Sequence, residues 1–164
     1  MAKQSAPRQI YFQHMTKTGY QEIEQQIRDL QKERPAKIKA LKAARALGDL
    51  SENTEYSTAK RELRHLESRM RYLNKQLTYA KIITTKDDGK VDMGKAVTIQ
   101  FTDDSETATY IIVGKHEADI ASGKIAFDSP LGKALMHHQV NDLVTVAAPA
   151  GAYQVKIKAV KVQE

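Results

Sequence analysis

Three carboxylates in the first half of the chain are spaced so that they could do chemistry together. Asp49, Glu52 and Glu55 recur every three residues in the segment 48–56, which reads Gly-Asp-Leu-Ser-Glu-Asn-Thr-Glu-Tyr. An Asp followed three residues later by a Glu is typical of a capping box at the start of a helix, where acids also suit the helix macrodipole. Carboxylate oxygens are also the ligands that Mg²⁺ takes, together with water and substrate phosphates. The spacing of Asp49 and Glu52 therefore permits capping, metal donation or both.

Two carboxylates alone do not make a tight magnesium site, because Mg²⁺ requires near-octahedral coordination. They can instead complete a site in another macromolecule, where the shared metal activates water for cleavage of a phosphodiester. The elements on either side of segment 48–56 must then deliver it to that site.

Apolar residues flank this segment on both sides at the spacing of paired helices. After the segment they alternate in steps of three and four residues, as in a coiled-coil seam, and a looser stripe of the same kind precedes it. Because the connection is short, we expect an antiparallel hairpin with the carboxylates at its tip. Each arm has about 27 to 30 residues and is roughly 40–45 Å long. The stripe residues are Tyr20, Ile23, Ile27, Leu30, Ile38 and Leu41 before the tip, and Tyr56, Ala59, Leu63, Leu66, Met70, Leu73, Leu77 and Ala80 after it.

Local signals predict where the arms begin and end. Thr16 or Thr18 can cap the first helix, Pro35 interrupts its backbone hydrogen bonding, and Gly48 suits its C-terminal end. The second helix is expected to continue to about Ile83, where β-branched residues lead into a linker.

The hydrophobic period changes to two after a linker at 86–89, which predicts a sheet. Ser129 followed by Pro130 predicts a short helix that reaches about His137. We therefore expect an α+β protein with an antiparallel coiled-coil hairpin over 1–83 and a small antiparallel sheet with one short helix over 84–164. The strands are expected at 95–101, 107–113, 124–127, 143–147 and 153–160.

The net charge of +6 is divided unevenly between these halves. Residues 1–83 hold 17 basic and 9 acidic side chains, whereas residues 84–164 hold 9 basic and 11 acidic ones. Basic residues follow the first arm toward the tip between Lys32 and Arg45, where only Glu33 is acidic. A solvated coiled-coil exterior is one interpretation, although such surfaces usually mix the two signs. The other is a basic stem that attracts phosphates and brings them beside the acidic tip.

Cysteine is absent, which excludes disulfides and thiolate metal sites. No apolar run is long enough to span a membrane, and the basic residues 1–8 lead into no apolar segment of a signal peptide. We expect a soluble cytosolic protein with no membrane partner.

The segment 43–56, Ala-Ala-Arg-Ala-Leu-Gly-Asp-Leu-Ser-Glu-Asn-Thr-Glu-Tyr, resembles the tip of the bacterial Gre transcript-cleavage factors, whose tips read A-R-x-x-G-D-L-x-E-N-x-E-Y. The resemblance extends from about residue 11 to residue 162. Its other supports are Met15-Thr16 with Gly19-Tyr20, Pro35, and the segments 110–114, 117–120 and 128–135.

The resemblance implies a hairpin followed by an FKBP-like module in a transcription elongation factor that is a monomer and not itself an enzyme. Gre factors bind bacterial RNA polymerase in backtracked complexes, in which the nascent RNA 3′ end is extruded into the secondary channel. The C-terminal module docks at the channel rim and the hairpin enters the channel. Tip acids then support a second Mg²⁺ in the polymerase active centre, and the polymerase cleaves its own transcript.

Residue by residue, the resemblance gives each matched position a role. Asp49 and Glu52 match the catalytic acids, which share Mg²⁺ only in the complex with polymerase; the isolated protein is expected to hold no metal tightly. The other matched positions are tip-supporting Asn53, Glu55 and Tyr56, RNA-contacting Arg45, Lys60 and Arg64, and polymerase-docking Glu117, Asp119, Ile120, Ser129 and Pro130.

The sequence leaves three alternative functions open. The family includes inhibitory relatives that occupy the secondary channel without stimulating cleavage, although the intact tip acids argue against that role. FKBP-like folds also include prolyl isomerases, but these need an aromatic-lined pocket, and the second half has no tryptophan. A passive coiled-coil adaptor would tolerate charge changes at the tip.

Overall fold

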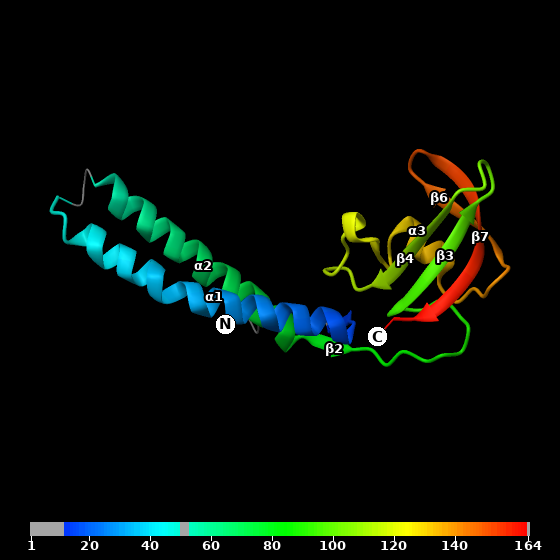
Figure 1. The fold of residues 1–164 in the computed structure, drawn as a ribbon, viewed down its shortest axis with the longest axis horizontal. Helices are drawn as coiled ribbons and strands as arrows, with labels where there is room; N and C mark the ends of the chain where they lie inside the picture. Colours follow the sequence, from blue (N-terminus) through cyan, green and yellow to red (C-terminus); the bar gives the residue numbers. More distant parts are fainter. Residues whose placement is uncertain (1–11, 50–52, 164) are drawn as a thin grey trace, which may run out of the picture. The chain divides into compact units, whose positions relative to one another are not determined.

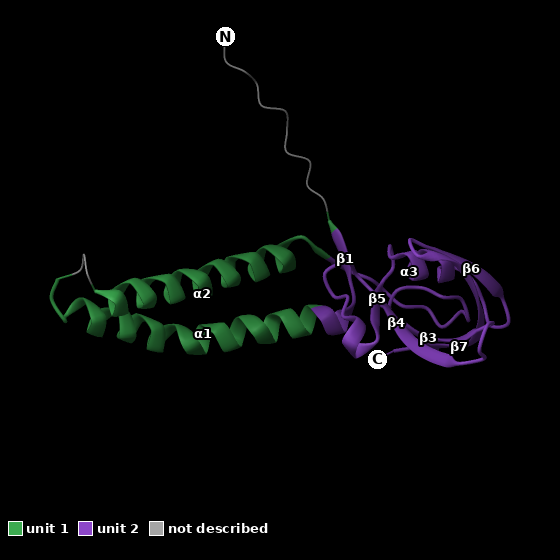
Figure 2. Ribbon diagram, turned by 90° about the horizontal axis from the view of Figure 1, so that it is seen from above, with its two compact units in different colours: residues 1–12, 20–80 green, residues 13–19, 81–164 purple. Residues whose placement is uncertain are grey.

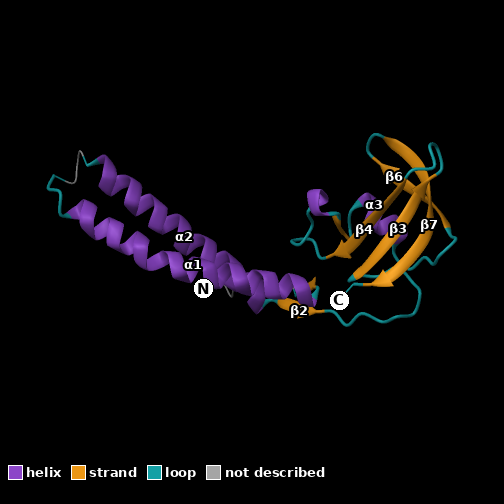
Figure 3. Cartoon of the chain, in the orientation of Figure 1, coloured by secondary structure: helices purple, strands orange, loops and turns teal. Residues whose placement is uncertain are grey.

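The computed structural model describes residues 12–49 and 53–163, which form two compact units (Figure 2). The first unit consists of Phe12 and residues 20–80 and is helical, whereas the second consists of residues 13–19 and 81–163 and contains the main sheet (Figures 1 and 3). The predicted α+β class is confirmed.

Two long helices, α1 (Lys17–Arg45) and α2 (Thr54–Thr78), lie side by side as the predicted hairpin (Figure 1). Every seventh residue of α2 from Ala59 is buried in the seam, as the heptad pattern predicts. The buried seam residues are Ile23, Ile27 and Ala44 of α1 and Ala59, Leu66 and Leu73 of α2. Apolar burial along this stripe therefore holds the arms together. In the described part of the chain, neither these helices nor any other has the length and apolar character needed to cross a bilayer.

Pro35 lies inside α1, next to the position where the apolar stripe is interrupted. Arg34, which occupies a position where an apolar residue was due, places its guanidinium 3.2 Å from Glu67 of α2. One turn further, the Lys37 ammonium lies 3.0 Å from Glu62. Both pairs are exposed, so each contributes about 0–1 kcal/mol to stability.

The second helix ends at Thr78, so the prediction that it continues to about Ile83 is wrong. The chain instead forms β2 (Ala80–Ile82), which pairs with β1 (Gln13–Met15) in a two-stranded sheet. The β-branched residues that follow Tyr79 favour extended backbone, and β1 offers a partner for it. The Ile83 amide then donates to the Met15 carbonyl at 3.0 Å.

The second unit is built on a five-stranded sheet in the order β5-β4-β3-β7-β6. The predicted antiparallel sheet is confirmed by its other neighbouring strands, whereas β5 runs parallel to β4. The connection through the 3₁₀ turn η1 (Ile120–Ser122) carries the chain back along β4 before β5 begins. The strands are β3 (Lys95–Phe101), β4 (Thr107–Val113), β5 (Lys124–Ala126), β6 (Leu143–Ala148) and β7 (Gly151–Val162).

Alternate residues of these strands face one apolar core. Val97 and Ile99 of β3, Val155 and Ile157 of β7, and Leu135 of the helix α3 (Pro130–Leu135) are fully buried in it.

The short helix α3 stops two residues before the predicted end at His137. His137 has φ +69°, which a right-handed helix does not allow, and its amide donates to the Val91 carbonyl at 2.8 Å.

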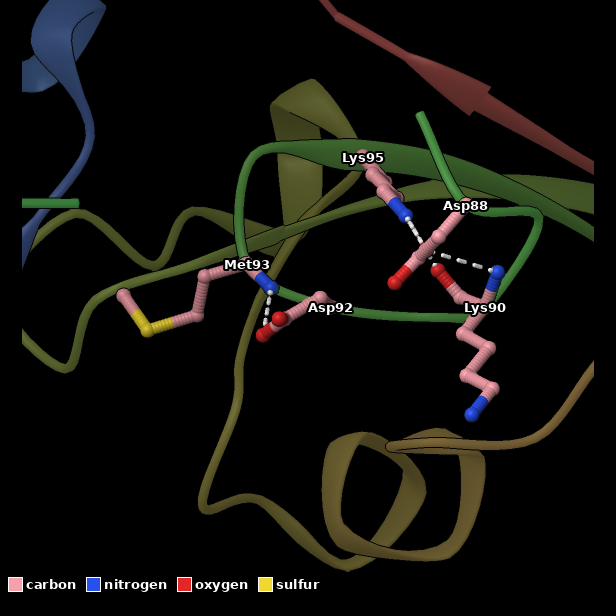
Figure 4. A network of polar contacts seen from close by, with 5 residues as sticks. All are labelled: Asp88, Lys90, Asp92, Met93 and Lys95. Atoms are coloured by element: carbon pink, nitrogen blue, oxygen red, sulfur yellow. Dashed lines mark hydrogen bonds and ion pairs between the residues drawn. The ribbon is translucent and has the colours of Figure 1, made fainter. Parts of the chain in front are cut away.

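A buried lysine ties the linker to the sheet (Figure 4). The side chain of Lys95 is only 1% exposed, and its ammonium donates to the Asp88 carboxylate and to the Lys90 carbonyl, both at 2.6 Å. Asp88 also accepts from the Lys90 amide at 3.1 Å. The bond from Lys95, followed by the bond from the Lys90 amide, lowers the pKa of Asp88. The linker is therefore held at its end against the first strand of the sheet.

Candidate functional site

The chain reverses at the hairpin tip between the last turn of α1 and the first turn of α2. Ala46 and Leu47 form a turn after Arg45, and Gly48 follows at φ +112°, a backbone conformation that favours glycine. Asp49 is exposed in this connection. Glu52, the second predicted metal ligand, lies outside the described residues.

Asn53 joins the two helices at the tip with one side chain. Its amide oxygen accepts from the Tyr56 amide at 3.0 Å and so caps α2, while its amide nitrogen donates to the Ala44 carbonyl at 2.7 Å. One residue thereby satisfies a donor at the start of α2 and an acceptor near the end of α1. We call this pair of bonds the Asn53 bridge.

The Asn53 bridge changes the interpretation of the acidic residues. Because Asn53 is the N-cap of α2, the interpretation of Asp49 as the first residue of a capping box for this helix is wrong. Glu55 lies in the first turn of α2 and is exposed. Asp49 and Glu55 thus present carboxylates at the end of the hairpin.

Two of the predicted RNA-contacting residues lie close to the ring of Tyr56. The Arg45 guanidinium lies 5.9 Å and the Lys60 ammonium 6.0 Å from the centre of its ring, within cation–π range. The hydrogen bond with Arg45 lowers the pKa of the Tyr56 hydroxyl, and the positive charge of Lys60 acts in the same direction. Arg64 is exposed one turn beyond Lys60 and lies outside this cluster. Among the residues that the structure describes, the tip therefore carries two exposed carboxylates and, next to them, an aromatic ring with two cations.

A groove between the helices near the tip was not predicted from the sequence. Small side chains leave it open, and Leu47 at its rim is 65% exposed. The alanines at 40, 43 and 44 are the signal that could have revealed it. The groove is lined by Ala40, Ala43, Ala44, Leu47, Thr54, Glu55, Thr58, Ala59 and Glu62.

The predicted docking residues lie in the second unit. Ile120 on η1 is 81% exposed, which is unusual for a large apolar side chain. Beside it, Asp119 accepts from the Ser122 hydroxyl at 2.6 Å, and this bond lowers the pKa of Asp119. Ser129 caps α3 by accepting from the Gly132 amide at 3.1 Å, and Pro130 is exposed at the first helical position.

Glu117 differs from these residues because its carboxylate is bonded within the chain. It accepts from the amide of Thr16 at 3.1 Å, from the amide of Gly114 at 2.9 Å and from the Thr16 hydroxyl. Its docking role stays a prediction.

The carboxylates at the tip suit a hard cation by their chemistry but do not surround one. Among the described residues, no three side chains of His, Cys, Asp or Glu are grouped so that they could hold a metal ion. Exposed Asp49 and Glu55 fit the contribution of one or two oxygen ligands to a magnesium ion held mainly by another macromolecule.

The arrangement defines a class of protein in which a helical hairpin presents a charged tip and a separate sheet unit offers an exposed surface. Two family models match the chain: "Transcription elongation factor, N-terminal" over residues 13–82 and "Transcription elongation factor, GreA/GreB, C-term" over residues 86–162. The chain belongs to the GreA/GreB family of transcription elongation factors.

Two sequence relatives agree with this assignment. A "Transcription elongation factor GreA 1" from Lactiplantibacillus plantarum is 58% identical over 150 residues, which cover 92% of this chain and 96% of that protein. A "Transcription elongation factor GreA" from Limosilactobacillus fermentum is 43% identical over 150 residues, covering 90% and 95%. Among solved structures, the GreA factor homolog 1 (Gfh1) protein of Thermus thermophilus is 25% identical with a TM-score of 0.43, covering 91% of this chain and 98% of that one.

Proposed function

We propose that this protein binds bacterial RNA polymerase in backtracked complexes and stimulates the polymerase's own cleavage of the extruded RNA 3′ end. The observation that carries the proposal is the exposure of Asp49 on a turn where Asn53 already caps the helix. A carboxylate exposed near the end of a long hairpin suits the contribution of an oxygen ligand to a magnesium ion in another macromolecule.

In this proposal, Asp49 and Glu52 add oxygen ligands to a Mg²⁺ ion in the polymerase active centre. The bound metal supplies an activated water and charge stabilisation for phosphodiester hydrolysis. Glu55 adds negative charge beside these ligands, and the Asn53 bridge fixes the turn that carries them. The protein is then not itself an enzyme, because the reaction belongs to the polymerase.

Arg45 and Lys60 attract the extruded RNA in this proposal. Their cations lie against the Tyr56 ring, which holds them near the turn and leaves their charge available to phosphates. Arg64 continues the positive surface one turn along α2. The stem thereby brings a phosphate backbone beside the acids.

Docking on the polymerase falls to the second unit. Exposed Ile120 supplies an apolar contact, with Asp119 beside it and Pro130 on α3 as further contacts. The protein acts as a monomer in the cytoplasm, with the polymerase and the nascent RNA as its partners.

The test uses purified bacterial RNA polymerase halted in a backtracked state on RNA labelled at its 5′ end. Adding this protein with Mg²⁺ should shorten the labelled transcripts and release short 3′ fragments. Binding to the polymerase without shortening would identify an inhibitory relative. A protein that neither binds nor shortens the transcript would refute the proposal.

A further inference from the structure

The Glu117 carboxylate accepts three hydrogen bonds from two distant parts of the second unit. One oxygen accepts from the Thr16 amide at 3.1 Å and the Gly114 amide at 2.9 Å, and the other accepts from the Thr16 hydroxyl. Hydrogen bonds to a charged acceptor are stronger than neutral ones, and these are partly buried. The carboxylate thereby joins residues about a hundred positions apart in the sequence.

Thr16 connects this carboxylate to α1. Its hydroxyl donates to Glu117 and also accepts from the Gly19 amide at 3.1 Å, which makes Thr16 the N-cap of α1. The same oxygen therefore belongs both to the helix start and to the Glu117 contact. We call Thr16, Gly19, Gly114 and Glu117 the Glu117 clamp.

Neither glycine of the clamp has room for a side chain in this arrangement. A Cβ at Gly19 would lie 1.8 Å from a carboxylate oxygen of Glu117, and one at Gly114 would lie 2.4 Å from the His14 carbonyl oxygen. Gly19 is inside α1, where alanine would otherwise favour the helix by about 1 kcal/mol. The absence of a side chain at residue 19 thus makes room for Glu117 at some cost to the helix.

We propose that Glu117 is a positioning residue, which fixes the first turn of α1 in the second unit and thereby controls where the tip acids are delivered. Residues 17–19 belong to the second unit, and α1 continues from them without a break to Arg45 (Figure 2). The helix has 29 residues and is about 43 Å long, so a swing of about 10° at its first turn displaces its far end by about 7 Å. Misplacement of about 1 Å can already lower a reaction rate a hundredfold. The importance of this clamp for cleavage rests on the proposed function.

The proposal differs from a docking role for Glu117 in what its removal changes. Loss of the clamp loosens the start of α1 and leaves the exposed docking surface around Ile120 unaltered. Glu117→Ala should therefore lower the maximal rate of transcript cleavage at least tenfold. The protein concentration that gives half of this rate should change less than twofold. Loss of a docking contact would instead raise that concentration.

Two further variants separate the clamp from the Glu117 side chain itself. Gly19→Ala keeps Glu117 and favours the helix but excludes the carboxylate from its place, so it should reproduce the effect of Glu117→Ala. Glu117→Gln should restore most of the parent rate, because its carbonyl oxygen can accept both amides and its amide nitrogen can donate to the Thr16 hydroxyl. A residue that acted by its charge on the polymerase would not be rescued by glutamine.

A distance measurement between two spin labels tests the clamp directly, without the cleavage assay. The chain has no cysteine, so Ser68→Cys on α2 and Thr145→Cys on β6 introduce two spin-label sites at exposed positions. The distance distribution between the labels should be narrow in the parent and in Glu117→Gln, and broad in Glu117→Ala and Gly19→Ala. An equally narrow distribution in all four proteins overturns the proposal, as does a loss of polymerase affinity in Glu117→Ala with an unchanged distribution.

If the parent fails to stimulate cleavage, the proposed function fails, and the distance measurement alone decides the role of the clamp. If Glu117→Ala does not fold, Gly19→Ala provides the same comparison.

Discussion

Replacing Asn53 by alanine removes both bonds of the Asn53 bridge at once. Loss of an N-cap costs about 1 kcal/mol, and loss of the 2.7 Å bond to the Ala44 carbonyl costs about 0.5–1.5 kcal/mol more. The tip should therefore open about 1.5–2.5 kcal/mol more easily, which corresponds to roughly ten- to seventyfold faster local amide exchange. Because the Asn53 bridge lies at the end of the hairpin, exchange in the core of the second unit should not change.

Hydrogen exchange followed by NMR at single residues measures this effect. In Asn53→Ala, exchange should accelerate at Tyr56, whose amide the bridge binds, and at Leu47, whose amide also donates to the Ala44 carbonyl at 3.2 Å. Asn53→Asp is the matched variant, since its carboxylate still caps α2 but cannot donate to Ala44. It should accelerate exchange at Leu47 and leave Tyr56 protected.

Three results would refute the reasoning about the bridge. Parent-like exchange at both residues in Asn53→Ala would show that the bridge does not hold the tip. Acceleration at Tyr56 in Asn53→Asp would assign the cap to another residue. Faster exchange throughout the second unit would show that the substitution acts on global stability.

Further predictions concern docking, RNA contact and the linker. Ile120→Asp should raise the protein concentration needed for half-maximal cleavage at least tenfold without changing the maximal rate, whereas Val140→Asp, at another exposed apolar position, should change it less than twofold. Arg45→Glu with Lys60→Glu should weaken crosslinking to the RNA 3′ end and reduce its dependence on salt concentration, whereas equal crosslinking at every salt concentration would make the stem an ordinary surface. The lowered pKa of Asp88 contributes stability above its ordinary value of 3.8, which is lost as the pH falls through the folded value. Asp88→Asn should therefore lower the melting temperature at pH 7 and flatten its decrease in acid, and a parent-like acid profile would contradict this.

The hairpin and most of the sheet could be predicted because long periodic patterns report burial directly. The heptad stripe identified Ala59, Leu66 and Leu73, and alternation located β3 and β4 with the bounds that the structure has. Capping residues were also readable, since Thr16 and Ser129 precede their helices directly.

Short and non-local features could not be predicted in this way. A three-residue strand such as β1 carries no period, and its pairing with β2 depends on chain segments far apart in the sequence. The parallel direction of β5 depends on the path of a connection, which periodicity does not describe.

At the site, the sequence identified the residue types but not the role of each residue. The spacing of Asp49 and Glu52 suggested a cap, whereas the cap and the link to α1 both belong to Asn53. Glu117 was assigned to docking by resemblance, and its bond to Thr16 required the fold to bring two distant segments together.

The most direct test of the proposed function compares three single acid-to-alanine variants in the cleavage assay on backtracked polymerase. Asp49→Ala and Glu52→Ala remove the proposed magnesium ligands, and Asp103→Ala removes an exposed carboxylate of the same kind from the turn between β3 and β4. We expect cleavage to fall by at least a hundredfold in the first two variants and to stay within twofold of the parent in the third, with equal binding to the polymerase in all. Parent-like cleavage by both Asp49→Ala and Glu52→Ala would contradict the claim that the tip acids serve the reaction.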